Sequence, residues 1–291
     1  MNFAGKRVLV TGSKGFIGSH LTDQLGKQGA DVVGIDISSG IDITDWEQVK
    51  GYGGIDFIYH LAAKTYIPST GEDPRQTYLV NLGGTLNMLE LGRMNNVRNF
   101  IFASSYVYGP PQYLPIDENH PVNPSNPYNR SKALGEGLCR AYYEDYGLKC
   151  VILRAFNIYG EGQGNNFLVP TILGQITGGK IQLNDPEPRR DFLYVKDAVE
   201  AYIEAADCSG AGLEVFNIGS GKSYSVDEIV TKILAFTGGE AEVRYLQKRR
   251  KNEIMDTVAD ITKAKKELGW EPKIDLEEGL RRYIKWYKAT S

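Results

Sequence analysis

A strand, a glycine turn and a helix follow one another directly near the start of the chain, and no other sequence feature restricts the fold as strongly. The apolar run 8–10 leads into Thr11, after which glycines stand at Gly12, Gly15 and Gly18. Glycines with this spacing allow a tight turn, close approach of the backbone to a phosphate, and close packing of helix against strand. Amide groups at the start of the helix then face an anion. The segment predicts a dinucleotide-binding turn, although glycines also end many strands for structural reasons alone.

Short apolar runs rich in Val, Ile and Phe recur along the first half of the chain, separated by stretches long enough for helices. They cover residues 7–10, 31–35, 55–61, 99–103 and 149–154. Such runs are typical of strands buried on both faces, and their alternation with helices predicts right-handed crossovers and a parallel sheet. We therefore expect an α/β protein with a doubly wound parallel sheet of the Rossmann type.

The pattern changes after about Ala155, where Gly- and Asn-rich connections become frequent. Candidate helices lie at 169–177, 196–206, 226–237 and 276–288. We expect residues 1–156 to form the dinucleotide-binding domain, with the chain returning to it near 190–206. Residues 157–291 are then expected to form a smaller C-terminal α/β region that binds the substrate.

Asp36 closes the second predicted strand, roughly 20 residues beyond the first glycines. A carboxylate at this place can accept hydrogen bonds from an adenosine ribose and would repel a 2′-phosphate, which favours NAD over NADP. A satisfied turn residue is the alternative interpretation. Asp42 and Ile43 follow after a short connection and are candidates to flank the adenine. Asp42 is equally a candidate N-cap for a helix that starts near Thr44.

Tyr128 and Lys132 stand four residues apart at the start of a predicted helix, so their side chains share one face. A tyrosine is a poor base at neutral pH, but a nearby cation lowers its pKa and favours the phenolate. The pair suits removal of a proton from a hydroxyl group. The strand at 99–103 ends in Ser104 and Ser105, whose hydroxyls are expected beyond the carboxyl end of the sheet, in the same crevice as the glycine turn. Tyr and Lys are also common on helix surfaces, and serines also cap strand ends.

Composition argues against several other classes of protein. The formal charge is -3, from 33 Lys and Arg against 36 Asp and Glu, which argues against a nucleic-acid surface. The N-terminus lacks the order of a secretory signal, and no apolar stretch approaches the ~20 residues of a membrane helix. We therefore expect a cytoplasmic protein with no membrane partner. The histidines form no ligand-spaced cluster, and three scattered cysteines predict neither a disulfide framework nor a metal site: Cys139, Cys150 and Cys208.

Four ordered motifs together resemble the extended short-chain dehydrogenase/reductase family. They are the glycine turn at 11–18, His60-Leu61-Ala62-Ala63, Ser104-Ser105 with Val107-Tyr108-Gly109, and Tyr128-x-x-x-Lys132. The similarity continues through residues 154–160, Arg190-Asp191-Phe192 and Leu268-Gly269-Trp270. The resemblance implies NAD as the cofactor and a nucleotide-diphosphate sugar as the substrate.

The resemblance also assigns roles by position. Tyr128 would be the general base, Lys132 would hold the nicotinamide ribose and lower the pKa of Tyr128, and Ser104 would bind the sugar hydroxyl. The implied cofactor-binding residues are Gly12, Gly15, Phe16, Ile17, Gly18, Asp36, Ile37, Asp42, Ile43, Leu61, Ala62, Ala63, Lys64, Asn81, Tyr128, Lys132 and Phe156. The implied substrate-binding residues are Ser104, Ser105, Asn157, Asn166, Arg190, Arg250 and Glu253, with the backbone of 181–183 near the base.

Within the family, the sequence is most similar to nucleotide-sugar epimerases such as UDP-glucose 4-epimerase. Their mechanism implies that Tyr128 takes the proton from the C4 hydroxyl while a hydride passes to NAD, so that a 4-keto sugar forms, turns and is reduced from its other face. The resemblance also implies a homodimer formed through two helices, with residues 74–94 and 131–146 as the candidates.

Three departures from the family pattern keep alternatives open. Ser105-Tyr106 replaces the Asp-Glu pair of sugar 4,6-dehydratases, so a dehydratase or decarboxylase lacks a dedicated acid and base. The shortened connection between Asp36 and Asp42 occurs in some 4-keto-sugar reductases, which makes an NAD(P)H-dependent reductase the main rival. The family's Arg-Pro-x-Asp appears here as Arg250-Lys251-Asn252-Glu253, which leaves the nucleotide open. A catalytically silent dinucleotide-binding protein is a remote alternative, because both Tyr128 and Lys132 are present.

Overall fold

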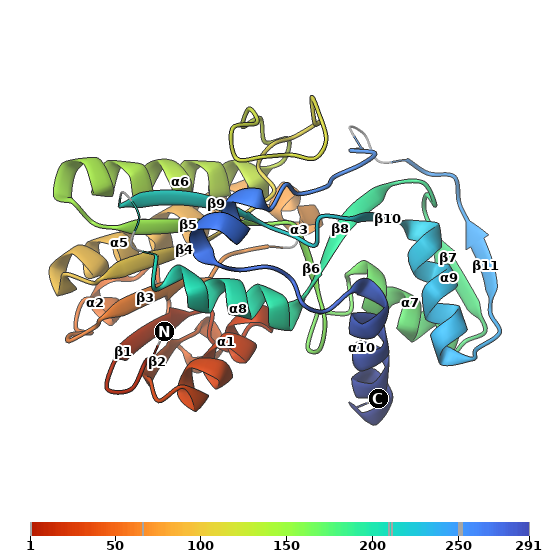
Figure 1. The fold of residues 1–291 in the computed structure, drawn as a ribbon, viewed down its shortest axis with the longest axis horizontal. Helices are drawn as coiled ribbons and strands as arrows, with labels where there is room; N and C mark the ends of the chain where they lie inside the picture. Colours follow the sequence, from red (N-terminus) through yellow and green to blue (C-terminus); the bar gives the residue numbers. More distant parts are fainter. Residues whose placement is uncertain (1, 66, 209, 211, 250–252, 291) are drawn as a thin grey trace.

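The computed structural model describes residues 2–65, 67–208, 210, 212–249 and 253–290. A larger part is built on a central sheet, and a smaller part beside it carries the C-terminal helix (Figure 1). Within the described residues, six strands form the central sheet in the order β2-β1-β3-β4-β5-β9, and every pair is parallel. The strands are β1 Arg7–Thr11, β2 Asp31–Ile35, β3 Phe57–His60, β4 Asn99–Ser105, β5 Cys150–Ala155 and β9 Leu213–Ile218. The predicted doubly wound parallel sheet is confirmed.

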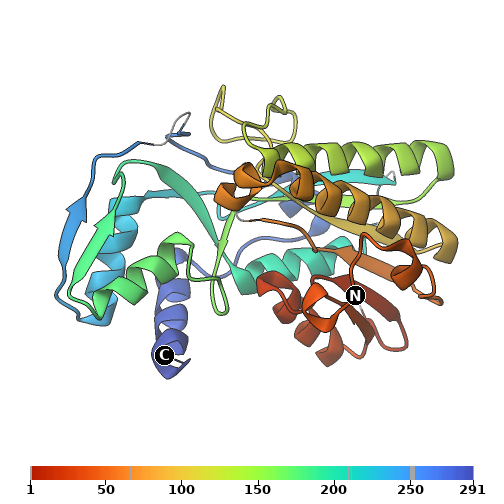
Figure 2. The same cartoon turned by 180° about the vertical axis from the view of Figure 1, so that it is seen from behind.

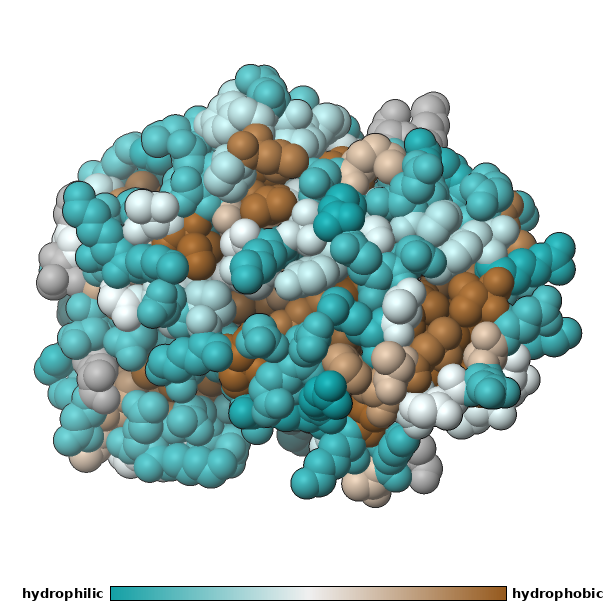
Figure 3. Space-filling model, turned by 45° about the vertical axis from the view of Figure 1, so that its right-hand side comes forward, coloured by the Kyte–Doolittle hydropathy of each residue, from teal (hydrophilic) through white to brown (hydrophobic). Residues whose placement is uncertain are grey.

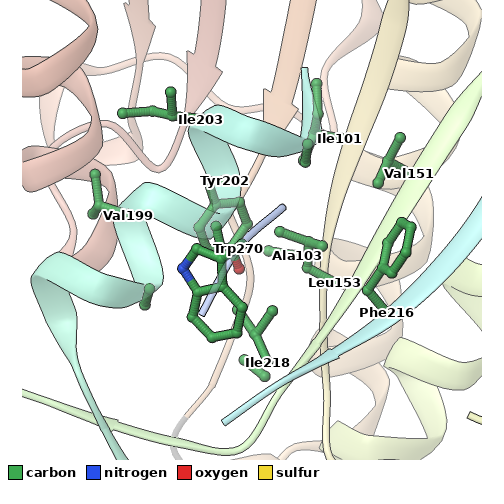
Figure 4. Close-up of a cluster of buried hydrophobic side chains, with 14 of the residues drawn as sticks. Ile101, Ala103, Val151, Leu153, Val199, Tyr202, Ile203, Phe216, Ile218 and Trp270 are labelled. Carbon is green, nitrogen blue, oxygen red and sulfur yellow. The ribbon is translucent and has the colours of Figure 1, made fainter. Parts of the chain in front are cut away.

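Side chains of the buried strands pack against helices on both faces of the sheet. In β4, Ile101 and Ala103 belong to one apolar cluster, whereas Phe100 and Phe102 belong to another, because successive side chains of a strand point to opposite faces. In Figure 4, Ala103 lies near the indole of Trp270, and Ile101 of the same strand belongs to the same cluster. The first cluster is covered by α1 Phe16–Lys27 and α8 Val195–Ala205, and the second by α5 Gly84–Asn95 and α6 Pro127–Tyr146.

Shorter helical segments connect these elements. They are η1 Ile37–Ser39, α2 Trp46–Val49, α3 Ile67–Glu72, α4 Pro74–Tyr78, the π-helix η2 Leu79–Gly83 and, near the C-terminus, the π-helix η3 Ala264–Leu268. Segments α4, η2 and α5 follow one another without a break and run beside α6, as Figure 2 shows.

The smaller part combines two short sheets with three helices. Its strands are β6 Asn157–Tyr159, β7 Lys180–Leu183, β8 Arg189–Tyr194, β10 Ser223–Ser225 and β11 Glu242–Tyr245, paired as β10-β8-β6 and β11-β7. Its helices are α7 Leu168–Ile176, α9 Val226–Thr237 and α10 Leu276–Thr290. A capping box starts α9, since the Ser225 hydroxyl accepts from the amide of Glu228 and the Glu228 carboxylate accepts from the amide of Ser225. These helices agree with the predicted ones within two residues, and the expected C-terminal α/β region is observed.

The chain returns to the central sheet over a longer stretch than the expected 190–206. After α8 it adds β9, which pairs with β5 from Cys150↔Leu213 to Ala155↔Ile218. We therefore propose that residues 1–156 together with 195–218 form the cofactor-binding part, and that most of the remaining chain forms the substrate-binding part. On the face shown in Figure 3, hydrophobic residues lie in separate patches among polar ones. Among the described residues, the helices are too short or too polar to cross a membrane.

Candidate active site

A cleft of about 1310 Å³ lies beyond the carboxyl ends of the central strands. It is lined both by the larger part and by β6, β7 and β8 of the smaller part, which matches the crevice where open α/β sheets bind ligands. The structure gathers here almost every residue predicted for the site. They are Gly12, Gly15, Phe16, Ile17, Gly18, Asp36, Ile37, Asp42, Ile43, Leu61, Ala62, Ala63, Lys64, Ser104, Ser105, Tyr128, Lys132, Phe156, Asn157, Asn166, Arg190 and Glu253. Arg250 lies outside the described residues.

The glycine turn brings three backbone segments too close together for side chains. Gly12 has a φ of +68°, and a Cβ there would lie 3.0 Å from backbone atoms of Ala62. A Cβ on Gly18 would overlap the carbonyl oxygen of Gly12. Helix α1 begins after Gly15 with no side-chain cap and no acidic residue in its first turn, so its first amides are available to an anion. The turn fits the pyrophosphate of a dinucleotide.

Replacing Gly18 with Ala is expected to weaken dinucleotide binding strongly, because the methyl group displaces the turn from α1. Overpacking of this kind costs roughly 1–3 kcal/mol of stability. Gly26 is the matched control, since it lies in the same helix and a Cβ there meets nothing within 4 Å. Calorimetric titration with NAD and thermal unfolding should show a loss for Gly18→Ala and none for Gly26→Ala. Equal NAD affinity in both variants would contradict this account of the turn.

Asp36 presents an ionised carboxylate to the cleft at the end of β2. Its oxygens accept hydrogen bonds from the amide of Lys14 at 3.0 Å and from the amide and hydroxyl of Ser38 at 2.9 and 2.7 Å. Burial alone would raise the pKa of Asp36, but the hydrogen bonds from Ser38 and Lys14 bring this pKa below its ordinary value. A carboxylate that stays charged suits ribose hydroxyls and disfavours a 2′-phosphate.

Asp42 has a different local role from the helix cap considered above. Its carboxylate accepts from the amide and the hydroxyl of Thr44, both at 2.8 Å, and so closes a turn. The N-cap of α2 is Asp45, whose side chain accepts from the amide of Glu47. Asp42 therefore caps no helix, and with Ile43 it lines the cleft as expected for residues near an adenine.

Tyr128 and Lys132 occupy the first turns of α6 on the face that meets the cleft. Asn126 caps this helix, because its side chain accepts from the amide of Asn129 at 2.9 Å, and Pro127 takes the first helical position. Burial raises the pKa of Tyr128, and its hydrogen bond with Ser105 acts in the opposite direction. The Lys132 ammonium lies 4.9 Å from the centre of the Phe102 ring. Burial lowers the pKa of Lys132 to about 8.

The two adjacent serines at the end of β4 have different partners. Ser105 is hydrogen-bonded to Tyr128, whereas the Ser104 hydroxyl donates to Glu136 Oε1 at 2.5 Å. Ser104 lines the cleft but is buried, with its hydroxyl turned toward α6. The expectation that Ser104 acts beside Tyr128 thus differs from the geometry, which favours Ser105 for that place.

Asn81 stands behind the cleft and supports two of its walls. Its side-chain oxygen accepts from the amide of Lys64 at 2.8 Å, and its amide group donates to the Ser131 hydroxyl at 2.8 Å. Ser131 in turn donates to the carbonyl of Tyr128 at 2.7 Å. Asn81 therefore joins the loop after β3 to the start of α6, and it does not line the cleft itself.

His60 is held neutral behind the same loop. Its ring nitrogens lie 2.8 and 2.9 Å from the hydroxyls of Thr11 and Thr85. The Thr11 oxygen also accepts from the amides of Leu61 and Ala62, so its proton is free to go to His60 Nδ1. Burial and, to a smaller extent, the charge of Lys132 lower the pKa of His60 to about 3. His60 therefore ties β1 to β3 and is not a titrating group near neutral pH.

The substrate side of the cleft carries an ion pair that the sequence did not reveal. Arg190 Nη2 lies 2.5 Å from Glu253 Oε1, and Arg190 Nη1 donates to the carbonyl of Ile254 at 2.7 Å. Arg190 and Glu253 were predicted separately, as a phosphate ligand and a ribose ligand, and the structure brings them together. Gln182 and Leu183 line the cleft, whereas Ile181 is buried in β7.

Several residues line the cleft without having been predicted, and three of them have polar side chains of interest: Tyr106, Gln163 and Thr257. The Tyr106 hydroxyl donates to the carbonyl of Gly109 at 2.5 Å, and its ring packs edge-on against Phe156. Gln163 and Thr257 each hold a buried side-chain oxygen that has no hydrogen-bond partner among the described residues. The position of Tyr106 directly after the paired serines was the available sequence signal. Gln163 and Thr257 are placed by tertiary folding alone.

Comparison with known proteins agrees with this geometry. A family model described as the NAD dependent epimerase/dehydratase family matches residues 8–219. A putative UDP-glucose 4-epimerase of Methanocaldococcus jannaschii is 35% identical over 98% of this chain and 99% of its own length. UDP-glucuronic acid decarboxylase 1 of Xenopus tropicalis is 30% identical over 97% of this chain and 72% of its own length.

Among solved structures, the UDP-glucose 4-epimerase of Thermotoga maritima with UDP-glucose has a TM-score of 0.91 and 30% sequence identity. The match covers 98% of this chain and 99% of that one. The chain therefore belongs to the NAD dependent epimerase/dehydratase family, and its cofactor is NAD.

Proposed function

We propose that this protein is a nucleotide-sugar epimerase that inverts C4 of the sugar through a transient 4-keto sugar. The observation that carries the proposal is the contact of Tyr128 with Ser105 beside Lys132, in the same cleft as the glycine turn. Tyr106, which has no acidic group, follows Ser105, where a dehydratase needs its acid and base. The relatives named as 4-epimerases support the same reaction.

Different residues of the cleft have different roles in this reaction. The glycine turn and Asp36 hold the dinucleotide, whose nicotinamide supplies hydride acceptance and return when it is bound. Tyr128 takes the proton from the sugar hydroxyl at its phenolic oxygen and later gives it back. Ser105 orients that hydroxyl, and the Lys132 ammonium stabilises the phenolate. On the opposite wall, Arg190 and Asn157 are placed for the diphosphate and the sugar.

The test is a panel of UDP-, GDP-, CDP- and dTDP-sugars, with the absorbance of reduced cofactor and the product stereochemistry followed together. Formation of an isomer without net cofactor change is the expected result and names the sugar. Stoichiometric gain or loss of NADH would overturn the epimerase in favour of a reductase or dehydrogenase. NAD binding without any conversion would favour a silent dinucleotide-binding protein.

We also propose that two copies pair through α5 and α6, with a cytoplasmic location as expected from the sequence. Large hydrophobic side chains on η2, α5 and α6 are 44% to 59% exposed, and these helices pack side by side. They are Leu79, Leu86, Met94, Leu134 and Tyr146. Exposed apolar stripes on adjacent helices are typical of a symmetric interface.

Replacing Leu134 with Glu is expected to convert this dimer into a monomer of 32.3 kDa, because a charge would then be buried in the shared face. Light scattering after size-exclusion chromatography measures the mass directly. Leu114→Glu is the matched control, since Leu114 is also exposed but lies outside these helices. A monomeric wild type, or a dimer that survives Leu134→Glu, would contradict the proposed interface.

A further inference from the structure

A buried ion pair lies behind the catalytic helix. The Glu136 carboxylate on α6 receives two arms of Arg154 on β5, with Nη2 to Oε2 at 2.7 Å and Nε to Oε1 at 3.0 Å. The side chains of Arg154 and Glu136 are only 8% and 10% exposed. A two-armed pair with this geometry fixes the relative orientation of its helix and its strand.

Arg154 extends this contact beyond the pair. Its third nitrogen, Nη1, lies 3.1 Å from the hydroxyl of Tyr108, and that hydroxyl donates to Asn217 Oδ1 at 2.5 Å. Burial works against the charge of Arg154, but the hydrogen bonds and the charge of Glu136 raise its pKa above the ordinary value. The charge on Arg154 is therefore permanent, and it depends on Glu136 for compensation.

Ser104 connects the ion pair to the reacting groups. Ser104 and Arg154 are direct neighbours in the pairing of β4 with β5, and Ser104 donates to Glu136 Oε1 at 2.5 Å. The next residue, Ser105, meets Tyr128 in the first turn of the same helix. The two serines therefore tie the end of β4 to α6 at two points.

Glu136 also lies one helical turn beyond Lys132, on the same face of α6. The groups that face Lys132 are Cys139 and Glu136 on its own helix, His60 on β3 and the Phe102 ring on β4. Burial lowers the pKa of Lys132, whereas the charges of Cys139 and Glu136 act in the opposite direction. His60 is neutral and burial raises the pKa of Cys139, so the carboxylate that Arg154 pairs with, Glu136, is the acidic group of this set beside Lys132.

We propose that Glu136, clamped by Arg154, is a positioning residue that holds β4 and α6 in the arrangement in which Ser105 meets Tyr128. The inference rests on the proposed function for its effect on turnover, but the geometry that it invokes exists without substrate. Glu136 touches no reacting atom. It acts through Ser104 and through the charge environment of Lys132.

Two variants separate these two routes. Ser104→Ala removes the tie to β4 and leaves the ion pair intact. Glu136→Gln keeps the volume and an acceptor oxygen but removes the charge. Glu214→Gln is the control. Glu214 lies at the start of the edge strand β9 and pairs with Lys263 at 3.0 Å in a partly buried contact.

The main readout is the titration of Tyr128 itself. The ultraviolet difference spectrum between each variant and the same variant carrying Tyr128→Phe isolates one phenol among the tyrosines and needs no substrate. We expect the midpoint to move to higher pH by about one pH unit in Glu136→Gln, because a looser contact between β4 and α6 weakens the hydrogen bond with Ser105 that lowers the pKa of Tyr128. Ser104→Ala should move it in the same direction by less, and Glu214→Gln should leave it unchanged.

Turnover is the second readout, with the substrate identified by the sugar panel. Small displacements of reacting groups can cost up to about a hundredfold in rate, so we expect kcat to fall roughly tenfold in Ser104→Ala and by more in Glu136→Gln. KM for the sugar and the affinity for NAD should stay within about threefold, because Glu136 does not line the cleft and the Ser104 hydroxyl is bonded to α6.

A merely structural role predicts a different pattern. If both variants lose thermal stability while the Tyr128 titration and kcat stay at wild-type values, the positioning role is overturned. If Glu136→Gln does not fold, the Tyr128 titration and kcat of Ser104→Ala alone test the positioning role. A wild type that converts no nucleotide sugar would overturn the proposed function, whereas the Tyr128 titration would still confirm or overturn the positioning role.

Discussion

Replacing Tyr128 with Phe is expected to lower turnover by roughly three orders of magnitude, within the range that positioned general bases contribute. The change removes one oxygen, which is the atom that receives the proton from the sugar hydroxyl in the proposed mechanism. The glycine turn and Asp36, which are proposed to hold the cofactor, are unaffected. The variant should therefore bind NAD as the wild type does, which separates loss of chemistry from loss of the cofactor.

Tyr146→Phe is the control for this experiment. Tyr146 ends the same helix and is 59% exposed, so it tests the same chemical change on α6 away from the cleft. Steady-state rates with the sugar named by the panel, together with NAD content after purification, give the comparison. Near-normal turnover of Tyr128→Phe would remove Tyr128 from the mechanism.

Replacing Lys132 with Met is expected to lower turnover at least a hundredfold, because the phenolate of Tyr128 loses its nearby cation. Met keeps most of the volume above the Phe102 ring, so the helix should still pack. NAD affinity should fall as well, since Lys132 lines the cofactor side of the cleft. Lys27→Met on the surface of α1 is the control, and a variant with wild-type rate and affinity would contradict the assignment.

The lowered pKa of Lys132 also predicts how activity depends on pH. Its folded-state pKa of about 8 is below the ordinary value of 10.5, so the ammonium is present below pH about 8 and is lost as pH rises through that value. Activity should decline on that alkaline side. For stability the sign is opposite, because between those two pH values the unfolded chain holds the extra proton and the free energy of unfolding rises with pH. Lys132→Met removes this contribution. The difference in free energy of unfolding between the wild type and the variant should therefore change with pH between about 8 and 10.5.

The strands that sequence reasoning missed share a physical reason. Strands β1, β3, β4 and β5 have neighbours on both sides in the sheet, and their continuous apolar runs are visible in the sequence. Strand β9 is an edge strand that includes Glu214 and Asn217, so it lacks such a run. The short strands of the smaller part pair with partners far away in the sequence, and their polar or charged side chains give no continuous apolar signal.

The candidate site shows the same division between local and tertiary information. Helical spacing was enough to place Tyr128 and Lys132 on one face, and the strand–turn–helix order was enough for the glycine turn. Which of Ser104 and Ser105 meets Tyr128 depends on how the last residues of β4 face α6, and a sequence does not display that orientation. The pairing of Arg190 with Glu253 joins residues 63 positions apart. Local patterns do not report contacts of that kind.

In the proposed function, the ion pair between Arg190 and Glu253 would make binding of the diphosphate an exchange of one anion for another. A diphosphate that reaches Arg190 takes the place of a carboxylate that is already there, so the guanidinium passes from one anion to another without being left bare in a partly buried wall. The net binding free energy is only the difference between the two pairings. This lowers the affinity for the diphosphate and favours its release after turnover. The displaced carboxylate of Glu253 would then be a free hydrogen-bond acceptor for the nucleotide.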